Sequence, residues 1–466
     1  MKIKLLCSLG FWILLLVLSC KSDDINFENP ARELSFSSDA LILDTVYSQV
    51  RSETYALKVY NRENRDVNIP EISLENGSAS PYRLNLDGKS GTNFRNVALR
   101  KKDSLYIFVE VAPVASASQA LAQDRILFET ASETQHVTLL SVVQDAEFFI
   151  ESKTNANIIS ENMVWNNQKV KIVYGKLTVA EGKTLEILPD TKIYFTKNSS
   201  LVLSKNATLN IKGDLGKEVI LRGDRNDTRY DTIPLNWKGV VAEPGAKLNV
   251  NYAKIFGGDT ALDLNGANAN ILNTVIHTFQ NYGIRAVDSG LTAQNLVMTN
   301  FGQAAVALYK GSSAEIVHST LANYNTFNTS LAANVIFAAN EWTNASGTKQ
   351  SGPVQLSVKN SIVYGAKDNG IVFKPISGQT FSYLFDSSLM KMGSDAGFTF
   401  ENNPAVVNSI KNADPKFLNT SVRKMNLRTA NESPARNKGR VSTALSVPLD
   451  IVKTPRTSNV TLGAYQ

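Results

Sequence analysis

The stretch "GKLTVAEGKTLEILPDTKIYFTKNSSLVLSKNATLNIKG", residues 175–213, decides the fold. Apolar residues two positions apart recur in it every eight residues, as Leu177/Val179, Leu185/Ile187, Ile193/Phe195, Leu201/Leu203 and Leu209/Ile211. A spacing of two is typical of a β-strand with one buried face, and the intervening segments, such as "AEGK", are turn-like. Two architectures have this eight-residue step: an antiparallel meander, or a solenoid with three short strands in each coil of about 24 residues.

The segment that follows distinguishes these two architectures. Five tetrapeptides align at steps of 21, 22, 23 and 42 residues: "YAKI" (252–255), "NTVI" (273–276), "NLVM" (295–298), "HSTL" (318–321) and "NSIV" (360–363). A second column of apolar pairs follows them: Leu262/Leu264, Ile284/Ala286, Val306/Leu308 and Ile371/Phe373. A meander has no reason to repeat at this period, whereas one turn of a β-solenoid does. We therefore predict a right-handed parallel β-helix over residues 149–410. The 42-residue step fits two coils, or one coil with an insertion at 325–353.

A different pattern precedes the solenoid. Residues 34–148 contain short alternating runs such as Tyr55-Leu57-Val59, separated by turn signals such as Glu75-Asn76-Gly77. About seven strands in roughly 110 residues is typical of a β-sandwich. We predict an all-β chain in which a small sandwich comes before the β-helix.

These segments also carry a family resemblance. "GDRNDTRYDTIPLNWKGVVAEPGAKLNVNYAKI" (223–255) and the tail with "ADPKF" (413–417) resemble Bacteroidetes-type surface lipoproteins with a right-handed parallel β-helix of the pectin-lyase-like kind. "YALKVYNRENRDVNIPEISLENGSASPYRLNL" (55–86) resembles Ig-like modules. The resemblance implies an Ig-like sandwich at 34–148 and a C-terminal segment, 411–466, that closes the β-helix. It does not define an activity, because one solenoid hosts lyases, hydrolases, adhesins and spacers.

The first residues predict export and a membrane anchor. Lys2 and Lys4 precede an apolar run at 5–18 that is short for a membrane span, so residues 1–19 read as a signal peptide. Val17-Leu18-Ser19-Cys20 resembles a bacterial lipobox, which implies cleavage before Cys20 and acylation of that residue. Cys7 would leave with the signal, so Cys20 has no partner for an internal disulfide. The alternative is an ordinary signal peptide with an incidental cysteine.

The anchor would determine where the protein resides. Several acyl chains on one residue give stable membrane attachment, and residues 20–33 would form a lipidated linker. Lys21-Ser22-Asp23-Asp24 resembles the surface-export signal of the same lipoproteins. We expect a protein of the cell envelope that is lipid-anchored in the outer membrane and exposed on the cell surface.

Composition argues against several other partners. The formal net charge of +6 falls to +4 when Lys2 and Lys4 are removed, and no long basic run exists, so we expect no nucleic-acid partner. The chain has three histidines and two cysteines, in no zinc-binding spacing, so we predict no metal and no cofactor.

Aromatic residues are the candidate ligand contacts. The interior of a β-helix is filled by its own side chains, so a ligand must bind to an outer face or beneath a loop. Phe279, Phe301 and Tyr324 each follow a strand end, one in each coil, where they would stack on sugar rings or on one another inside a turn. Trp342, inside the 325–353 insertion, is the better aromatic candidate for a binding surface.

The polar candidates favour structural roles. Asp263 and Arg285 would be outward neighbours about 5 Å apart, as an acid–base pair or, as we favour, a surface ion pair. Asn273, Asn295, His318 and Asn360 share one position of the repeat, which predicts a ladder of hydrogen-bonded side chains at a corner. We predict no catalytic residue.

These observations favour a non-catalytic, lipid-anchored envelope protein that binds a glycan or an envelope protein along the lateral face of its β-helix. The alternative is a polysaccharide lyase or glycoside hydrolase with a site beneath the 325–353 insertion. A third option, a spacer, differs from the first only in lacking a ligand.

Overall fold

The structure is a computed structural model. It describes residues 27–47, 51–111, 119–130, 133–225, 228–325, 327 and 331–466. Cys20 and the predicted signal peptide lie outside these residues, so the lipid anchor stays a prediction. Within the described part of the chain, no helix combines the length and the apolar character that crossing a bilayer requires. The chain divides into two compact units, one ending at Gln144 and the other spanning Asp145–Gln466.

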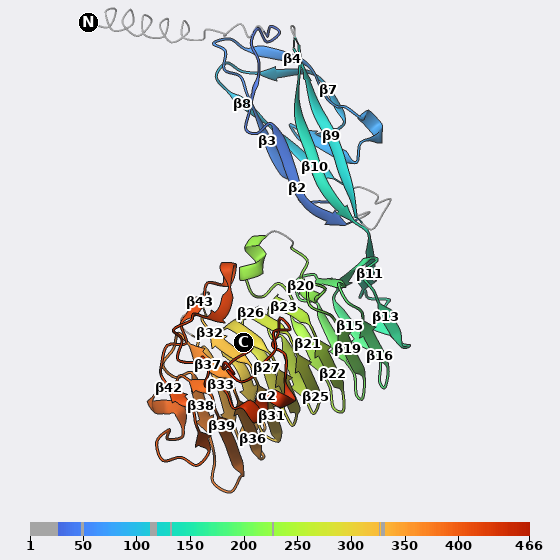
Figure 1. The fold of residues 1–466 in the computed structure, drawn as a ribbon. Coiled ribbons are helices and arrows are strands. Elements are labelled where there is room, and N and C mark those ends of the chain that lie inside the picture. Colours follow the sequence, from blue (N-terminus) through green and yellow to red (C-terminus); the bar gives the residue numbers. More distant parts are fainter. Residues whose placement is uncertain are drawn as a thin grey trace, which may run out of the picture. The chain divides into compact units, whose positions relative to one another are not determined.

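The N-terminal unit is built from two five-stranded sheets (Figure 1). The first contains, in spatial order, β1 (Ser35–Phe36), β3 (Tyr55–Tyr60), β8 (Ser104–Val111), β5 (Tyr82–Leu86) and β6 (Lys89–Gly91). The second contains β2 (Ala40–Tyr47), β10 (Thr134–Gln144), β9 (Gln119–Glu129), β4 (Val67–Leu74) and β7 (Asn93–Leu99). Residues of both sheets form one core, including Leu57, Ile72 and Phe128. This packing is that of a β-sandwich; its assignment as Ig-like stays a prediction.

The C-terminal unit contains three long sheets, here named S1, S2 and S3. S1 consists of β11 (Ala146–Ile150), β14 (Val170–Tyr174), β17 (Lys192–Phe195), β20 (Val219–Gly223), β23 (Ala253–Gly258), β26 (Val275–Phe279), β29 (Val297–Phe301), β32 (Thr320–Asn323), β37 (Ile362–Gly365), β40 (Leu389–Met390) and β42 (Ile410–Lys411). S2 consists of β12 (Ile158–Ile159), β15 (Lys176–Val179), β18 (Ser200–Leu203), β21 (Gly239–Ala242), β24 (Leu262–Asn265), β27 (Tyr282–Val287), β30 (Ala304–Leu308), β33 (Asn334–Ala339) and β38 (Ile371–Lys374). S3 consists of β13 (Met163–Trp165), β16 (Thr184–Ile187), β19 (Thr208–Lys212), β22 (Lys247–Asn251), β25 (Asn268–Leu272), β28 (Gly290–Gln294), β31 (Ser312–Val317), β36 (Val354–Lys359), β39 (Phe381–Asp386) and β41 (Val406–Val407).

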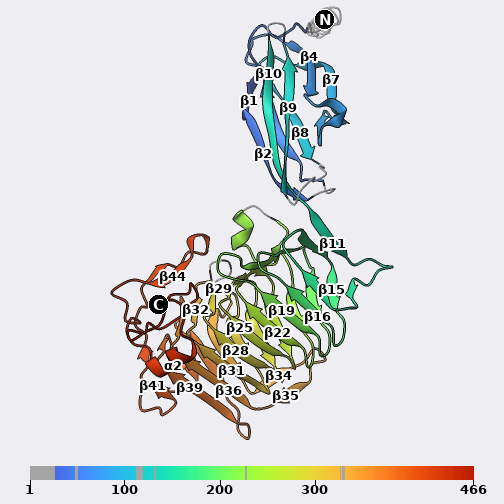
Figure 2. The same cartoon turned by 45° about the vertical axis from the view of Figure 1, so that its right-hand side comes forward.

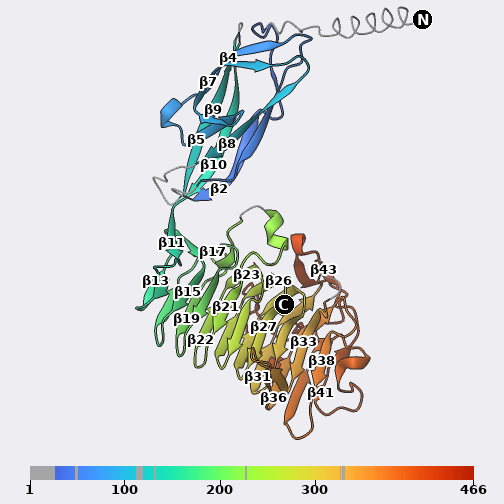
Figure 3. The same ribbon diagram turned by 180° about the vertical axis from the view of Figure 1, so that it is seen from behind.

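All strand pairs within these three sheets are parallel, and their register explains the sequence period. Leu177 pairs with Leu201 in S2, and Leu185 pairs with Leu209 in S3, each 24 residues further on. Each eight-residue step therefore moves the chain from one sheet to the next. The apolar pairs point inward and form a single core along the unit. The predicted all-β class and parallel β-helix are confirmed (Figures 2 and 3).

The 42-residue step is one enlarged coil. β32 pairs directly with β37, so no coil lies between them in S1. The predicted insertion, however, contains a regular strand: β33 lies in S2 between β30 and β38 and places Ile336 in the column of Val306 and Ile371. A hairpin of β34 (Glu341–Thr343) and β35 (Lys349–Ser351) then leads to β36 of S3.

The chain after β42 folds back over the side of the solenoid. It contains β43 (Phe417–Asn419), β44 (Asn426–Thr429) and α2 (Val441–Ser446). Its Leu427 and Ala464 pack with Val297 of S1, and its Leu462 packs with Ile362 and Leu389. The segment predicted to close the β-helix therefore covers the outer face of S1, a role that we did not predict (Figure 1).

Candidate functional site

Two of the predicted ligand contacts lie in the core. Phe279 and Phe301 have no exposed area, and their rings stack on each other with centroids 6.4 Å apart. The preceding residues, Thr278 and Asn300, have positive φ angles of 61° and 67°, which turn the chain so that the next side chain points inward. The predicted alternative, that Phe279 and Phe301 stack on one another inside a turn, is confirmed, and the prediction that they contact a ligand is wrong because the backbone at the strand end buries both rings.

Tyr324 is covered by the C-terminal segment. Its ring packs edge-on against Phe417 of β43, with centroids 6.3 Å apart, and burial raises the pKa of its hydroxyl. An internal contact therefore occupies this ring. Tyr324 stays only partly exposed, so the prediction that it stacks on a sugar is not supported by this contact.

Trp342 lies on the outer face of S2, where it belongs to an aromatic cluster. Its ring packs on that of Tyr309, with centroids 4.7 Å apart, and the guanidinium of Arg285 lies 5.2 Å from its centre. Tyr309 also packs on Phe337 of β33. Trp342 stays partly exposed, so it remains a candidate contact, and these contacts hold its hairpin against S2.

The described carboxylates around this insertion are held in ion pairs. Asp263 accepts two hydrogen bonds from Arg285, one of them from Nε at 2.9 Å, as expected for a surface ion pair between stacked coils. Glu341 pairs with Lys349 across the β34–β35 hairpin at 2.8 Å. Each of these two carboxylates is thus held against a cation by a direct contact.

The predicted ladder forms at the turn from S3 to S1. Asn295 donates to Asn273 Oδ1 at 2.8 Å, Asn273 donates to Asn251 Oδ1 at 2.9 Å, and Asn360 lies 3.0 Å from His318 Nε2. His318 is fully buried; burial first, and Arg456 second, lower its pKa to about 3. This imidazole is neutral and structural, as the ladder predicted.

Between the two halves of the ladder stands Arg456 of the C-terminal segment. It donates to Asn295 Oδ1 at 2.8 Å and to the carbonyl of Val447 at 3.1 Å, and only 5% of its surface is exposed. Burial lowers its pKa to about 10, so it remains a cation at neutral pH. The corner of the solenoid is thus the place where the C-terminal segment is attached.

The outer face of S3 carries the largest of the described cavities, a groove of about 610 Å³. Its floor consists of outward residues from five successive strands, which Figure 2 shows side by side from β22 to β36. One row, in register, is formed by Lys247, Asn268, Gly290, Ser313 and Gln355. The next row is formed by Asn249, Asn270, Thr292, Glu315 and Ser357.

Small polar side chains keep this groove open. Gly290 has no side chain and Ser313 a short one, so the middle of the first row is hollow. Thr292 Oγ1 donates to Asn270 Oδ1 at 3.1 Å, while the side-chain amide of Asn268 makes no hydrogen bond with any residue that the structure describes. The groove therefore offers hydroxyl and amide groups to a hydroxyl-rich ligand, repeated at the strand spacing of about 4.8 Å.

The sequence contained a signal for this groove that our prediction missed. Asn249, Asn270, Thr292 and Glu315 follow one another at 21, 22 and 23 residues, the same steps as the ladder. Each lies between two inward apolar residues, as Asn270 lies between Ala269 and Ile271. Aligning the polar residues as well as the apolar ones would have shown an uncharged polar row with one acid at its end.

No group of His, Cys, Asp and Glu side chains able to hold a metal ion is found among the described residues. No carboxylate other than Glu315 lines the S3 groove in the described part of the chain, and it pairs with Lys359 at 2.7 Å. Glycoside hydrolysis ordinarily uses two carboxyl groups across the bond that is cleaved. The described lining of the groove thus combines uncharged polar groups with a single, paired carboxylate.

Comparison with known proteins gives no family. No family model matches the chain, and no curated protein matches its sequence. The catalytic domain of a family 87 α-1,3-glucanase, solved with nigerose, aligns over 78% of this chain and 88% of its own, with 11% identity and a TM-score of 0.22. A family 123 glycoside hydrolase from Clostridium perfringens aligns over 24% of this chain and 27% of its own, with 9% identity and a TM-score of 0.19. A PapD-like domain of human CEP192 aligns over 28% of this chain and 99% of its own, with 13% identity and a TM-score of 0.17. Scores this low carry no inference about activity.

Proposed function

We propose that this chain is a lipid-anchored protein of the cell envelope, attached to the outer membrane through Cys20, whose β-helix binds a polysaccharide along the outer face of S3 without cleaving it. The observation that carries the proposal is the groove: five coils present small hydroxyl and amide groups in two rows, next to an exposed path along the solenoid. A sugar ring is about as long as the strand spacing of 4.8 Å, so a polymer that lies along the coils would meet one pair of rows per unit.

The composition of the groove favours a largely neutral glycan. Its charged lining consists of Lys247 and of the paired Glu315 and Lys359, so most contacts would be made by uncharged groups. Hydroxyl groups of a sugar exchange donors and acceptors with Asn, Ser and Thr at little cost, since both sides lose similar contacts with water. Charged polymers would find few partners here.

The test uses residues 21–466, which lack the signal peptide and the lipidated residue but retain both units. The protein is applied to a glycan array, and affinity for each bound glycan is measured by calorimetry. Thr292→Tyr with Ser313→Tyr fills the hollow with exposed rings and is expected to weaken binding at least tenfold, about 1.4 kcal/mol. Thr178→Tyr, an outward residue of S2, is the matched control and should bind as the unchanged protein does.

Three results would contradict the proposal. If no glycan is bound, the reading as a spacer replaces it. If Trp342→Ala abolishes binding while the filled groove does not, the binding surface is the aromatic cluster on S2. If a bound glycan is shortened on incubation, seen as new reducing or unsaturated ends, the protein is a hydrolase or lyase. The anchor is tested separately: Cys20→Ala should release the protein from membranes and prevent incorporation of labelled fatty acid.

A further inference from the structure

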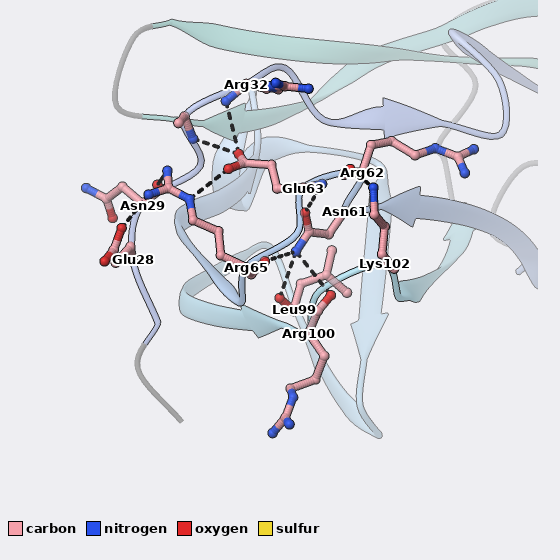
Figure 4. Close-up of polar contacts among 11 residues, drawn as sticks. Glu28, Asn29, Arg32, Asn61, Arg62, Glu63, Arg65, Leu99, Arg100 and Lys102 are labelled. Atoms are coloured by element: carbon pink, nitrogen blue, oxygen red, sulfur yellow. Dashed lines mark hydrogen bonds and ion pairs between the residues drawn. The ribbon is translucent and has the colours of Figure 1, made fainter. Parts of the chain in front are cut away.

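One end of the N-terminal unit carries a basic pocket. It has a volume of about 290 Å³ and is lined by Arg32, Arg62, Glu63, Asn64, Arg65 and Lys102 (Figure 4). Four of these six residues are cations and one is an acid. The neighbouring Arg100 and Lys101 are also exposed and add to the positive charge of this end.

Asn61 holds two basic loops together beneath the pocket. Its side chain is 2% exposed; Nδ2 donates to the carbonyls of Arg65 and Arg100 at 2.9 and 3.1 Å, and Oδ1 accepts from the N–H of Glu63 at 2.8 Å (Figure 4). Lys102 has a φ of 59° and donates from Nζ to the carbonyl of Arg62 at 2.6 Å. The position of these basic residues is therefore fixed by buried and local hydrogen bonds.

Glu63 binds the segment that contains Ala31 and Arg32, and it also forms an ion pair with Arg65. Its carboxylate accepts from the N–H groups of Ala31 and Arg32 at 2.8 and 3.0 Å and from Arg65 Nε at 2.7 Å. Arg65 also pairs with Glu28. The charges of Glu63 and Arg65 are thus paired with groups of the pocket itself and stabilise its three segments.

Three cations around the pocket have no such partner. Arg32, Arg62 and Lys102 are exposed, and no carboxylate lies within ion-pair distance of them in the part of the chain that the structure describes. Arg62 lies over the ring of Tyr60, 4.5 Å from its centre, which limits the directions its guanidinium takes. Several cations around one hollow suit a group with several anionic oxygens, such as a phosphate.

The chain enters the unit beside this pocket. Asn68 donates its N–H to the carbonyl of Glu28 at 2.7 Å, so the first described residues lie against the loop that contains Arg65. Cys20 precedes Phe27 by seven residues, which span at most about 25 Å. An acylated Cys20 would keep the pocket within that reach of the bilayer surface.

From these observations we infer that the basic pocket binds the phosphate groups of anionic lipids in the membrane that anchors the chain, so that the N-terminal unit is oriented on that surface. The inference rests on the proposed lipid anchor for its biological setting. The contact itself requires only the described residues, since lipid phosphates attract exposed Arg and Lys side chains at the membrane surface.

The test measures vesicle binding by the non-lipidated residues 21–466. Vesicles of phosphatidylcholine alone are compared with vesicles that also contain phosphatidylglycerol, at low and at physiological salt. We expect binding to the anionic vesicles only, weakened by salt, and about 100-fold weaker binding for Arg32→Gln/Arg62→Gln/Lys102→Gln. The matched control, Lys89→Gln/Arg95→Gln/Arg125→Gln, removes the same charge elsewhere on the same unit and should stay within about threefold of the unchanged protein. Thermal melting confirms that both variants fold.

Each other outcome would overturn the inference. Equal losses in the two variants would mean that net charge alone attracts the protein, and full binding by the first variant would place the contact elsewhere. Calorimetric binding of inorganic phosphate that depends on Arg32, Arg62 and Lys102, without vesicle binding, would make the pocket a site for free anions. The proposed lipid anchor is tested separately. If Cys20 proves to be unmodified, the anchor proposal is wrong, but binding of the protein to anionic vesicles would still support the inference about the pocket.

Discussion

The outer faces of S1 and S3 belong to the same coils but carry opposite chemistry. In register along S1, the outward row consists of Val275, Val297, Thr320, Ile362, Leu389 and Ile410. The corresponding row along S3 consists of Asn249, Asn270, Thr292, Glu315 and Ser357. The first row is covered by the C-terminal segment, and the second lines an open groove. Outward residues thus indicate which side of a solenoid is covered by its own chain and which meets other molecules.

Among substitutions that test this difference between S1 and S3, Arg456→Ala is expected to have the largest effect on the free energy of unfolding. The substitution leaves Asn295 Oδ1 and several carbonyls of the C-terminal segment without their buried donor. We expect the free energy of unfolding to fall by about 3 to 5 kcal/mol. Urea unfolding measures it, and limited proteolysis should cut the C-terminal segment first. Lys453→Ala, which removes an exposed ion pair with Asp214, should cost less than about 1 kcal/mol.

A similar loss in both Arg456→Ala and Lys453→Ala would contradict the view that the buried corner attaches the segment. It would mean that attachment is spread over the exposed contacts instead.

Leu427→Ala tests the apolar part of the covered face. Leu427 is 2% exposed and packs against Val297 and Ala322 of S1. Truncation of a buried leucine costs about 2 to 4 kcal/mol, since it removes apolar contact and leaves a cavity. Leu418→Ala is the control, because this leucine of β43 is 56% exposed and should change the free energy of unfolding by less than about 0.5 kcal/mol. Indistinguishable unfolding midpoints for the two variants would show that S1 is not covered in solution.

The buried corner should also respond to acid. The pKa of His318 is lowered to about 3, against about 6.5 in the unfolded chain, so below pH 6.5 the unfolded state takes up a proton that the folded state excludes. Stability is therefore lost as pH falls, by roughly 2 kcal/mol at pH 5 from this residue.

His318→Asn removes that contribution while keeping the ladder, since asparagine occupies the same position in neighbouring coils at the same positive φ. Urea unfolding at pH 7 and pH 5 should show a smaller acid loss in the variant than in the unchanged protein. Equal losses would mean that His318 is protonated without unfolding.

The smallest effect is expected on the open face. Asn270 and Thr292 are exposed, so Asn270→Ala and Thr292→Ala should change the free energy of unfolding by less than about 0.5 kcal/mol each. The same urea measurements provide the comparison with Leu427→Ala. A loss above about 1.5 kcal/mol in either variant would show that part of the chain covers S3 as well.

Most of the solenoid could be predicted because its coils repeat. Inward pairs such as Leu185/Ile187 fix both the strand and its face, and the ladder residues mark one corner of each coil. β33 was missed because a long loop separates it from β32 and a hairpin follows it directly, so Ile336 lies 30 positions after Val306 instead of about 22. Repetition predicts position only where loop lengths stay nearly constant.

The site was harder to predict than the fold. The two roles offered for Phe279 could not be separated from the sequence, because the left-handed backbone at Thr278 directs the next side chain inward and no sequence pattern marks threonine for that conformation. The covering of Tyr324 depends on Phe417, which lies more than ninety positions away in a segment without a repeat. The basic pocket is assembled from Arg32, Arg62 and Lys102 on three separate loops, and only the short run Arg100-Lys101-Lys102 marks one of them in the sequence.

The returning C-terminal segment also has a mechanical consequence. In an ordinary solenoid each rung touches only its neighbours, so the last rungs can peel away one at a time. Here Lys453 pairs with Asp214 and Arg440 pairs with Asp386, so the C-terminal segment connects an early coil to a late one. When the molecule is pulled from its C-terminus, detachment of the C-terminal segment should require a higher force than the coil-by-coil unfolding that follows. During synthesis, the coils are expected to lack these two contacts until the segment that carries Arg440 and Lys453 has been made.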